Sequence, residues 1–251
     1  MSNWLTEIRS QHDSAKKSEL ARGFASQEKF LMRKAYWCYC NCFPPPDQIH
    51  FERFQEDQIN AISEFYLSAE KTSLRTNDIG SPDRPMAKQL FFSWHYPRFP
   101  EFLFSLSEYG CVVLLADMPP WLNFPKEHCI LFRNGARETR MLIKALNAGA
   151  PIFFMLDYCY DGTRSVESDF LGQRCKTPSG IVELALRYSY CINFIPANVS
   201  ISDANFESVA LESNVGNVIN AMNKCIEQDL LKNPTSWLLW PSLDRRWVNY
   251  R

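Results

Sequence analysis

One histidine follows an apolar run in this sequence and is the best placed residue for acid–base chemistry. The run QLFFSW ends at His95, and five residues then separate His95 from Glu101. A histidine can take a proton from a hydroxyl or an amine near neutral pH, and a nearby carboxylate can hold its imidazole in one tautomer. The pattern therefore indicates a base, His95, and an orienting acid, Glu101. The alternative is a hydrogen-bonded core histidine with a surface glutamate.

A polar segment follows a second apolar run. Asp157 comes directly after PIFFML, and the turn DYCYDGTR leads on to Arg164. Three further arginines, Arg133, Arg137 and Arg140, lie close together upstream. Guanidinium groups bind phosphate in bidentate fashion, so this set could hold an anionic part of a substrate. A plain Asp-Gly turn and a solvated helix start are the alternatives.

Strands that alternate with helices are expected to position these side chains. Apolar runs of strand length end near His95 and Asp157, and others cover residues 111–116 and 191–196. Amphipathic patterns predict helices over residues 101–108, 137–147, 177–190 and 215–231. This order is typical of an α/β fold with a mostly parallel central sheet flanked by helices. Ligands bind beyond the carboxyl ends of such strands, where His95 and Asp157 would lie.

The helix predicted over residues 177–190 has a start signal, with Thr177 as N-cap and Pro178 at the first helical position. Ahead of the strands, residues 1–35 and 57–69 show helical spacing. The length fits one large domain. We therefore expect a single domain over residues 1–251, with a helical N-terminal region over 1–85 and an α/β core over 86–251.

The composition excludes several classes of protein. Of the 251 residues, 46% are hydrophobic and 22% are charged, and the formal net charge of -1 gives no general attraction to nucleic acid. A basic patch must be local, and Arg245, Arg246 and Arg251 are the candidates. No apolar stretch reaches the ~20 residues of a transmembrane helix, and no signal peptide is apparent. We expect a cytoplasmic protein with at most peripheral contact to the inner membrane.

The nine cysteines are expected to be reduced thiols, because several stand inside apolar runs as small buried residues do. Cys38, Cys40 and Cys42 alternate and would share one face of a strand, but they lack the CxxC spacing of a zinc site, so no metal is expected. The GxSxG, phosphate-loop, GxGxxG and HExxH motifs are missing, which argues against the hydrolases, nucleotidases, dehydrogenases and zinc proteases that use them.

Taken in order, four segments resemble the lipid A late acyltransferase branch of the lysophospholipid acyltransferase superfamily. They are FFSWHYPRFPEFLFSL, LFRNGARETRMLIKALNAGAPIFFMLD, DFLGQRCKTPSGIVELALRYSYCINFIPA and NPTSWLLWPSLDRR, within residues 89–198 and 233–246. They are similar to that family's histidine–acid motif, its arginine-bearing helix and buried strand ending in Asp, its Phe-x-Gly and Thr-Pro passage, and its closing Trp and Arg-Arg element. The ordered set carries more weight than any one motif.

The resemblance implies a glycerolphosphate-acyltransferase-like fold and the transfer of an acyl or aminoacyl group from a thioester to a hydroxyl or amine. It implies His95 as general base and Glu101 as its orienting partner. The donor would be a phosphopantetheine thioester of coenzyme A or of acyl carrier protein, the expected partner, and the acceptor a small molecule or a lipid. No permanently bound cofactor is expected. The implied substrate-binding residues are Arg133, Arg140, Asp157 and Arg164.

Two features depart from the family pattern. The family separates its histidine and acid by four residues, whereas five separate His95 and Glu101 here, and we expect no counterpart of the family's N-terminal membrane anchor. The altered spacing leaves open a catalytically silent member that acts as a binding module in a biosynthetic complex. A thioester hydrolase, which would release free acid without an acceptor, is the other alternative.

Overall fold

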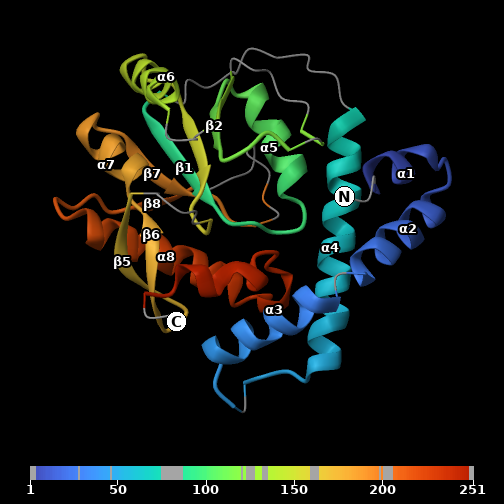
Figure 1. Ribbon diagram of the computed structural model, residues 1–251. Helices are drawn as coiled ribbons and strands as arrows, with labels where there is room; N and C mark the ends of the chain where they lie inside the picture. The colour runs from blue at the N-terminus through green and yellow to red at the C-terminus, as the bar shows by residue number, and fades with distance from the viewer. Residues whose placement is uncertain are drawn as a thin grey trace.

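The computed structural model (Figure 1) describes residues 4–27, 29–45, 47–74, 87–119, 121–122, 128–131, 135–158, 164–197, 199 and 206–248. Its centre is a six-stranded sheet in the order β3-β2-β4-β1-β7-β8. Strands β1, β2, β3, β4 and β7 are parallel, and β8 (Glu207–Val209) runs antiparallel to β7 (Cys191–Phe194). The predicted α/β fold with a mostly parallel sheet is therefore confirmed.

The inner strands are short and apolar, as the sequence predicts. They are β1 (Gln89–Ser93), β2 (Val112–Leu115), β4 (Ile152–Met155) and β7, while β3 (Cys129–Leu131) forms the far edge. Consecutive side chains of β1 and β4 are buried. This is the pattern of strands that are covered on both faces of a sheet.

Helices cover both faces of the sheet. In Figure 1, α6 (Ala136–Asn147) and α7 (Gly180–Arg187) lie on one side, and α5 (Phe99–Glu108) lies on the other. The β1-α5-β2 and β3-α6-β4 connections run in opposite directions along the sheet, so right-handed crossovers put α5 and α6 on opposite faces. The last long helix, α8 (Val215–Leu230), packs against β7 and β8.

The N-terminal region is helical, as predicted. Helices α1 (Trp4–Ser10), α2 (Ser14–Ser26) and α3 (Lys29–Cys42) precede a longer helix, α4 (Phe51–Leu74). α4 packs against α2 and α5, and it also contacts η3 (Pro234–Ser236). α3 packs against η4 (Trp240–Arg246). These contacts hold the C-terminal segment against the N-terminal helices, close to the sheet.

One element was predicted wrongly. Thr177 and Pro178 do not start a helix; they end β6 (Gln173–Pro178), which pairs with β5 (Ser165–Phe170) in an antiparallel hairpin. Helix α7 begins two residues later, at Gly180. Leu171 and Gly172 form the hairpin turn with φ values of 49° and 71°, as a two-residue turn between twisted strands requires. Pro178 is tolerated because β6 is an edge strand of a two-stranded sheet.

Cys38, Cys40 and Cys42 lie on α3, so they do not share one face as they would on a strand. None of the eight cysteines within the described ranges forms a disulfide. In the same ranges, no group of three or more His, Cys, Asp or Glu side chains is arranged to hold a metal ion. No helix of the described residues has the length and apolar character needed to span a membrane.

Candidate functional site

Two neighbouring strands bring a histidine and an aspartate together. β1 and β4 pair in parallel, with Ser93 opposite Met155. The backbone N–H of Leu156 donates to the carbonyl of Ser93 at 3.1 Å, which continues the pairing beyond the strands. His95 and Asp157 each lie two residues beyond the last strand pair, so both reach the same point at the carboxyl edge of the sheet. This is the edge at which open α/β sheets bind ligands.

The contact between these two residues is bidentate. The backbone N–H of His95 donates to Asp157 Oδ2 at 2.8 Å, and the ring Nδ1 lies 2.8 Å from Oδ1. The Asp157 side chain is fully buried, whereas 19% of the His95 side chain is exposed. When Nδ1 donates its proton to the carboxylate, Nε2 keeps its lone pair and can accept a proton. The arrangement is therefore suited to general base chemistry.

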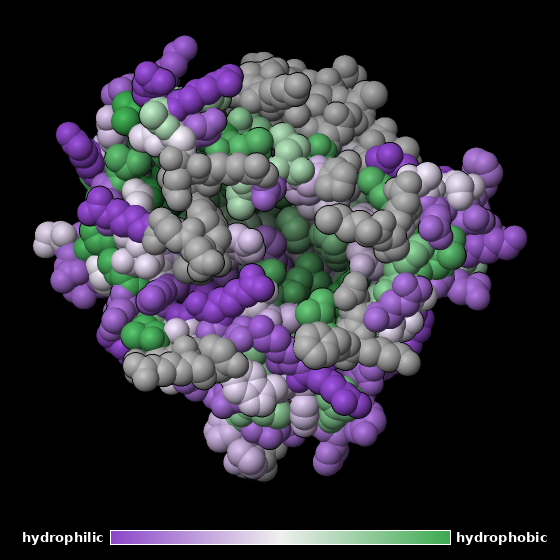
Figure 2. Space-filling view, in the orientation of Figure 1, coloured by the Kyte–Doolittle hydropathy of each residue, from purple (hydrophilic) through white to green (hydrophobic). Residues whose placement is uncertain are grey.

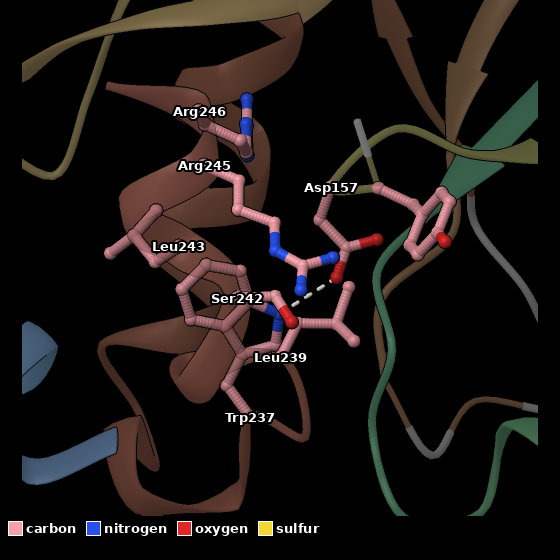
Figure 3. A pocket seen from close by; sticks show the side chains of 8 residues that line it. Asp157, Trp237, Leu239, Ser242, Leu243, Arg245 and Arg246 are labelled. Atoms are coloured by element: carbon pink, nitrogen blue, oxygen red, sulfur yellow. Dashed lines mark hydrogen bonds between the residues drawn. The ribbon is translucent and has the colours of Figure 1, made fainter. Parts of the chain in front are cut away.

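A tryptophan from the C-terminal segment completes the set of donors around the carboxylate. Trp237, which is fully buried, donates its indole N–H to Asp157 Oδ2 at 2.7 Å (Figure 3). The next backbone N–H, of Leu238, donates to the carbonyl of His95 at 3.1 Å. Burial acts to raise the pKa of Asp157, but the charge of His95 and the hydrogen bonds from His95 and Trp237 outweigh it and lower that pKa. Asp157 is therefore held as a carboxylate.

This lowered pKa predicts how stability depends on pH. The folded pKa lies below the unfolded value of about 4, so the ionised Asp157 adds stability above about pH 4 that is lost as the pH falls through the lowered pKa. We expect Asp157→Asn to have a lower free energy of unfolding than the parent at neutral pH, and this difference should shrink in acid. Urea unfolding of both proteins across pH measures it. A difference that stays constant down to acid pH would contradict the prediction.

Glu101 does not contact His95, contrary to the sequence expectation. Its Oε2 accepts a hydrogen bond from Arg98 at 3.2 Å, and its Oε1 lies 3.8 Å from Lys71 Nζ on α4. Helix α5 begins at Phe99, two residues before Glu101, and this start turns the glutamate toward α4. The ring of Phe99 packs edge-on against His95 instead, with centroids 5.0 Å apart. The carboxylate beside His95 belongs to Asp157.

The two arginines expected to bind substrate that the structure describes, Arg140 and Arg164, are not gathered around His95. Arg133 lies outside the described residues. Arg140 is exposed on α6, where its Nε donates to the carbonyl of Ala136 at 3.1 Å. Arg164 pairs with Glu183 at 2.9 Å, and 77% of its side chain is exposed. Neither Arg140 nor Arg164 contacts Asp157, the fourth expected residue, which is the partner of His95.

A pocket of about 70 Å³ opens beside Asp157 (Figure 3). Asp157 and Tyr158 line one side. The Tyr158 ring also lies near His95, with centroids 6.1 Å apart, so the pocket adjoins the histidine. The other side comes from the C-terminal segment and consists of Trp237, Leu239, Ser242, Leu243, Arg245 and Arg246.

An aromatic cluster lies on another side of His95. Phe99 stacks on Phe65 of α4 at 5.5 Å and meets the edge of Trp121 at 5.7 Å between ring centroids. Figure 2 shows a hollow with hydrophobic walls near the centre of this face of the molecule. The site thus combines a polar pocket beside Asp157 with apolar rings beside His95.

Sequence reasoning assigned no role to Trp237 or Tyr158, and it identified Arg245 and Arg246 only as part of a local basic patch. Trp237, Arg245 and Arg246 lie in the closing segment NPTSWLLWPSLDRR, whose resemblance to a family element was the available signal. Their place beside Asp157 depends on how the C-terminal segment folds back onto the sheet.

Comparison with known proteins supports the resemblance found in the sequence. Residues 129–248 match the family model of the bacterial lipid A biosynthesis acyltransferases. The matched region includes Asp157, Trp237 and Arg245, and His95 precedes it. None of the curated proteins compared with the chain matches it. The expected resemblance to the lipid A late acyltransferase branch is therefore confirmed over residues 129–248.

Proposed function

We propose that this protein transfers an acyl or aminoacyl group from a phosphopantetheine thioester to a hydroxyl or an amine, with His95 as general base and Asp157 as its orienting partner. The donor is carried by acyl carrier protein or coenzyme A, and the acceptor is a small molecule or a lipid. The bidentate contact between His95 and Asp157 at the carboxyl edge of the sheet carries the proposal. The family match supports acyl transfer as the class of reaction.

The reaction proceeds in a single ternary complex. His95 Nε2 takes the proton from the acceptor hydroxyl or amine while the acceptor oxygen or nitrogen attacks the thioester carbonyl carbon. The tetrahedral intermediate then expels the thiol sulfur, and His95 returns the proton to this leaving group. Asp157 stabilises the imidazolium that forms between these two proton transfers. The products are the acylated acceptor and the free phosphopantetheine thiol.

Three of the thiols that the structure describes are poorly suited to form an acyl-cysteine intermediate. Burial raises the pKa of Cys38 and of Cys129 to about 11, and burial with the nearby charge of Glu207 raises that of Cys225 to about 12. A thiol must be deprotonated to act as a nucleophile, so these three are inert near neutral pH. None of them contacts His95.

The aromatic rings beside His95 make one side of the site apolar. Phe99 contacts His95 directly and packs against Phe65 and Trp121; Phe99 and Trp121 are buried, and Phe65 is the partly exposed ring that an acyl chain can reach. Burying apolar atoms of an acyl chain against these rings contributes about 25 cal/mol for each Å² removed from water. This favours a donor whose acyl group is apolar near its carbonyl.

The contact between His95 and Asp157 supports the enzyme proposal over a silent binding module. That reading rests on the altered spacing between His95 and Glu101, but Asp157 supplies a buried carboxylate that does not depend on this spacing. We place the reaction in the cytoplasm, where acyl carrier protein and coenzyme A thioesters are available, with at most peripheral contact to the inner membrane.

Thioester turnover tests the proposal. The protein is incubated with a panel of acyl thioesters of acyl carrier protein and coenzyme A, with and without hydroxyl and amine acceptors, and both released thiol and products are quantified. We expect thiol release that depends on an acceptor and matches the acylated product mole for mole. Free acid formed without an acceptor would identify a hydrolase, and an inert protein would favour the binding module.

A further inference from the structure

Arg245 has an unusual setting for a surface arginine. It is exposed on η4, and Figure 3 shows its side chain extending across the pocket toward Asp157. Within the part of the chain that the structure describes, Arg245 makes no hydrogen bond or ion pair. A guanidinium has five N–H donors in a planar fork that matches carboxylate and phosphate oxygens. Arg245 therefore presents an unused anion-binding group at the site.

The neighbouring arginine, Arg246, has a structural role. It is buried, its Nη2 donates to the Thr177 hydroxyl at 2.8 Å, and its guanidinium lies 4.5 Å from the centroid of the Phe170 ring. These contacts fix η4 against the β5–β6 hairpin. Since Arg246 is already held by protein groups, Arg245 is the arginine of this pair that can bind a ligand.

The pocket in front of Arg245 has room for a small anionic group, and its two arginines, Arg245 and Arg246, outnumber the single carboxylate of Asp157 in its lining. Its volume is about 70 Å³, whereas a single water needs only about 10–15 Å³. It therefore has room for a carboxylate or a phosphate with part of its stem. The Ser242 side chain also lines the pocket, and its hydroxyl makes no hydrogen bond within the described ranges, so it offers a second donor.

We propose that Arg245 binds a carboxylate or phosphate of the acceptor, so that the protein acylates small acceptors carrying an anionic group near the reacting hydroxyl or amine. This inference rests on the proposed acyl transfer. The pocket shares Asp157 with the catalytic pair, and Tyr158 lies beside both the pocket and His95. A bound anion here is thus a short distance from the base. The acceptor's hydroxyl or amine must lie at His95 to react. An anionic group a short distance away on the same acceptor can therefore reach the pocket.

The donor's phosphate does not fit the same position. In a phosphopantetheine arm, the thioester and the phosphate stand at opposite ends of a long chain. When the thioester carbonyl lies at His95, an extended arm carries its phosphate away from the pocket beside Asp157. The anion held by Arg245 is therefore assigned to the acceptor.

Anion binding tests the site without reference to activity. Inorganic phosphate and acetate are titrated by calorimetry into the parent protein, Arg245→Gln and Arg187→Gln. Arg187 is exposed at the end of α7, next to the amino edge of the sheet, and serves as the matched control. We expect saturable binding to the parent and to Arg187→Gln, weakened about tenfold or more in Arg245→Gln. The parent binding neither anion, or Arg245→Gln binding both as well as the parent, overturns the proposal.

Two further measurements identify the source of the anion. Transfer is compared for L-serine, O-phosphoethanolamine and ethanolamine, and we expect Arg245→Gln to raise KM for the two anionic acceptors alone. A changed kcat for all three would show instead that Arg245 only balances the charge of Asp157. Affinity for 4′-phosphopantetheine relative to pantetheine should be the same in the parent and in Arg245→Gln, and a selective loss would assign the site to the donor. If no thioester is consumed, the proposed function fails, while the phosphate and acetate titrations still decide the anion site.

Discussion

His95→Ala should lower the rate of acyl transfer by about 10²-fold or more, because it removes the group that takes the acceptor's proton. The rate is measured as released thiol with saturating thioester and acceptor. The loss should appear in kcat, since the imidazole acts in the transition state and contributes little to binding in the ground state. His12→Ala, on an exposed histidine between α1 and α2, is the matched control and should retain the parent rate.

The alanine variant also leaves the buried carboxylate of Asp157 without its main partner, which is itself destabilising. His95→Asn separates the two effects. Its side-chain amide can donate to Asp157 from roughly the place of Nδ1, but it has no basic nitrogen. We expect this variant to keep its melting temperature close to that of the parent and to be as inactive as His95→Ala. A folded His95→Asn protein with full activity would rule out His95 as the base.

The sheet was predictable because its signals are local. The inner strands appear in the sequence as short, continuous apolar runs, and the helices between them appear as amphipathic patterns. The structure contains both, with bounds that differ from the predicted ones by a few residues. The hairpin β5–β6 was missed because Thr177-Pro178 also has the form of a helix start. Pairing with β5 decides whether this segment forms a strand or starts a helix. β5 lies upstream, and its alternation of apolar and polar residues is weak. Here a tertiary contact overrode a local capping signal.

The site was only half predictable, for a related reason. His95 and Asp157 could both be placed at strand ends from the sequence, but their contact depends on β1 and β4 being neighbours, and β2 and β3 intervene along the chain. Without that order, the nearest carboxylate in sequence, Glu101, was the natural choice of partner. The contact between Trp237 and Asp157 joins residues that are still farther apart in the sequence. It forms only when the C-terminal segment folds back onto the sheet.

Asp157→Asn is expected to be the second most damaging change, with kcat lowered by about 10²-fold or more. Three N–H groups point at this carboxylate, two from His95 and one from Trp237. An asparagine has one oxygen to accept them and places an NH₂ donor at the other position. If that NH₂ faces the imidazole, Nδ1 must become the acceptor and the ring proton moves to Nε2. In this tautomer Nε2 can no longer take a proton from the acceptor.

Glu101→Gln is the matched test of the partner inferred from sequence spacing. Glu101 makes its ion pairs with the half-exposed Arg98 and the exposed Lys71, and such surface pairs are worth little. We therefore expect kcat to stay within about twofold of the parent value. Rates are normalised to the folded fraction, measured by circular dichroism, because Asp157→Asn is also expected to be less stable. If Glu101→Gln lost as much activity as Asp157→Asn, or Asp157→Asn retained the parent rate, the pairing of His95 with Asp157 would not be the one used in catalysis. Loss of activity in Glu101→Gln would instead indicate that His95 works with Glu101, as the family's histidine works with its acid, despite the additional residue between them.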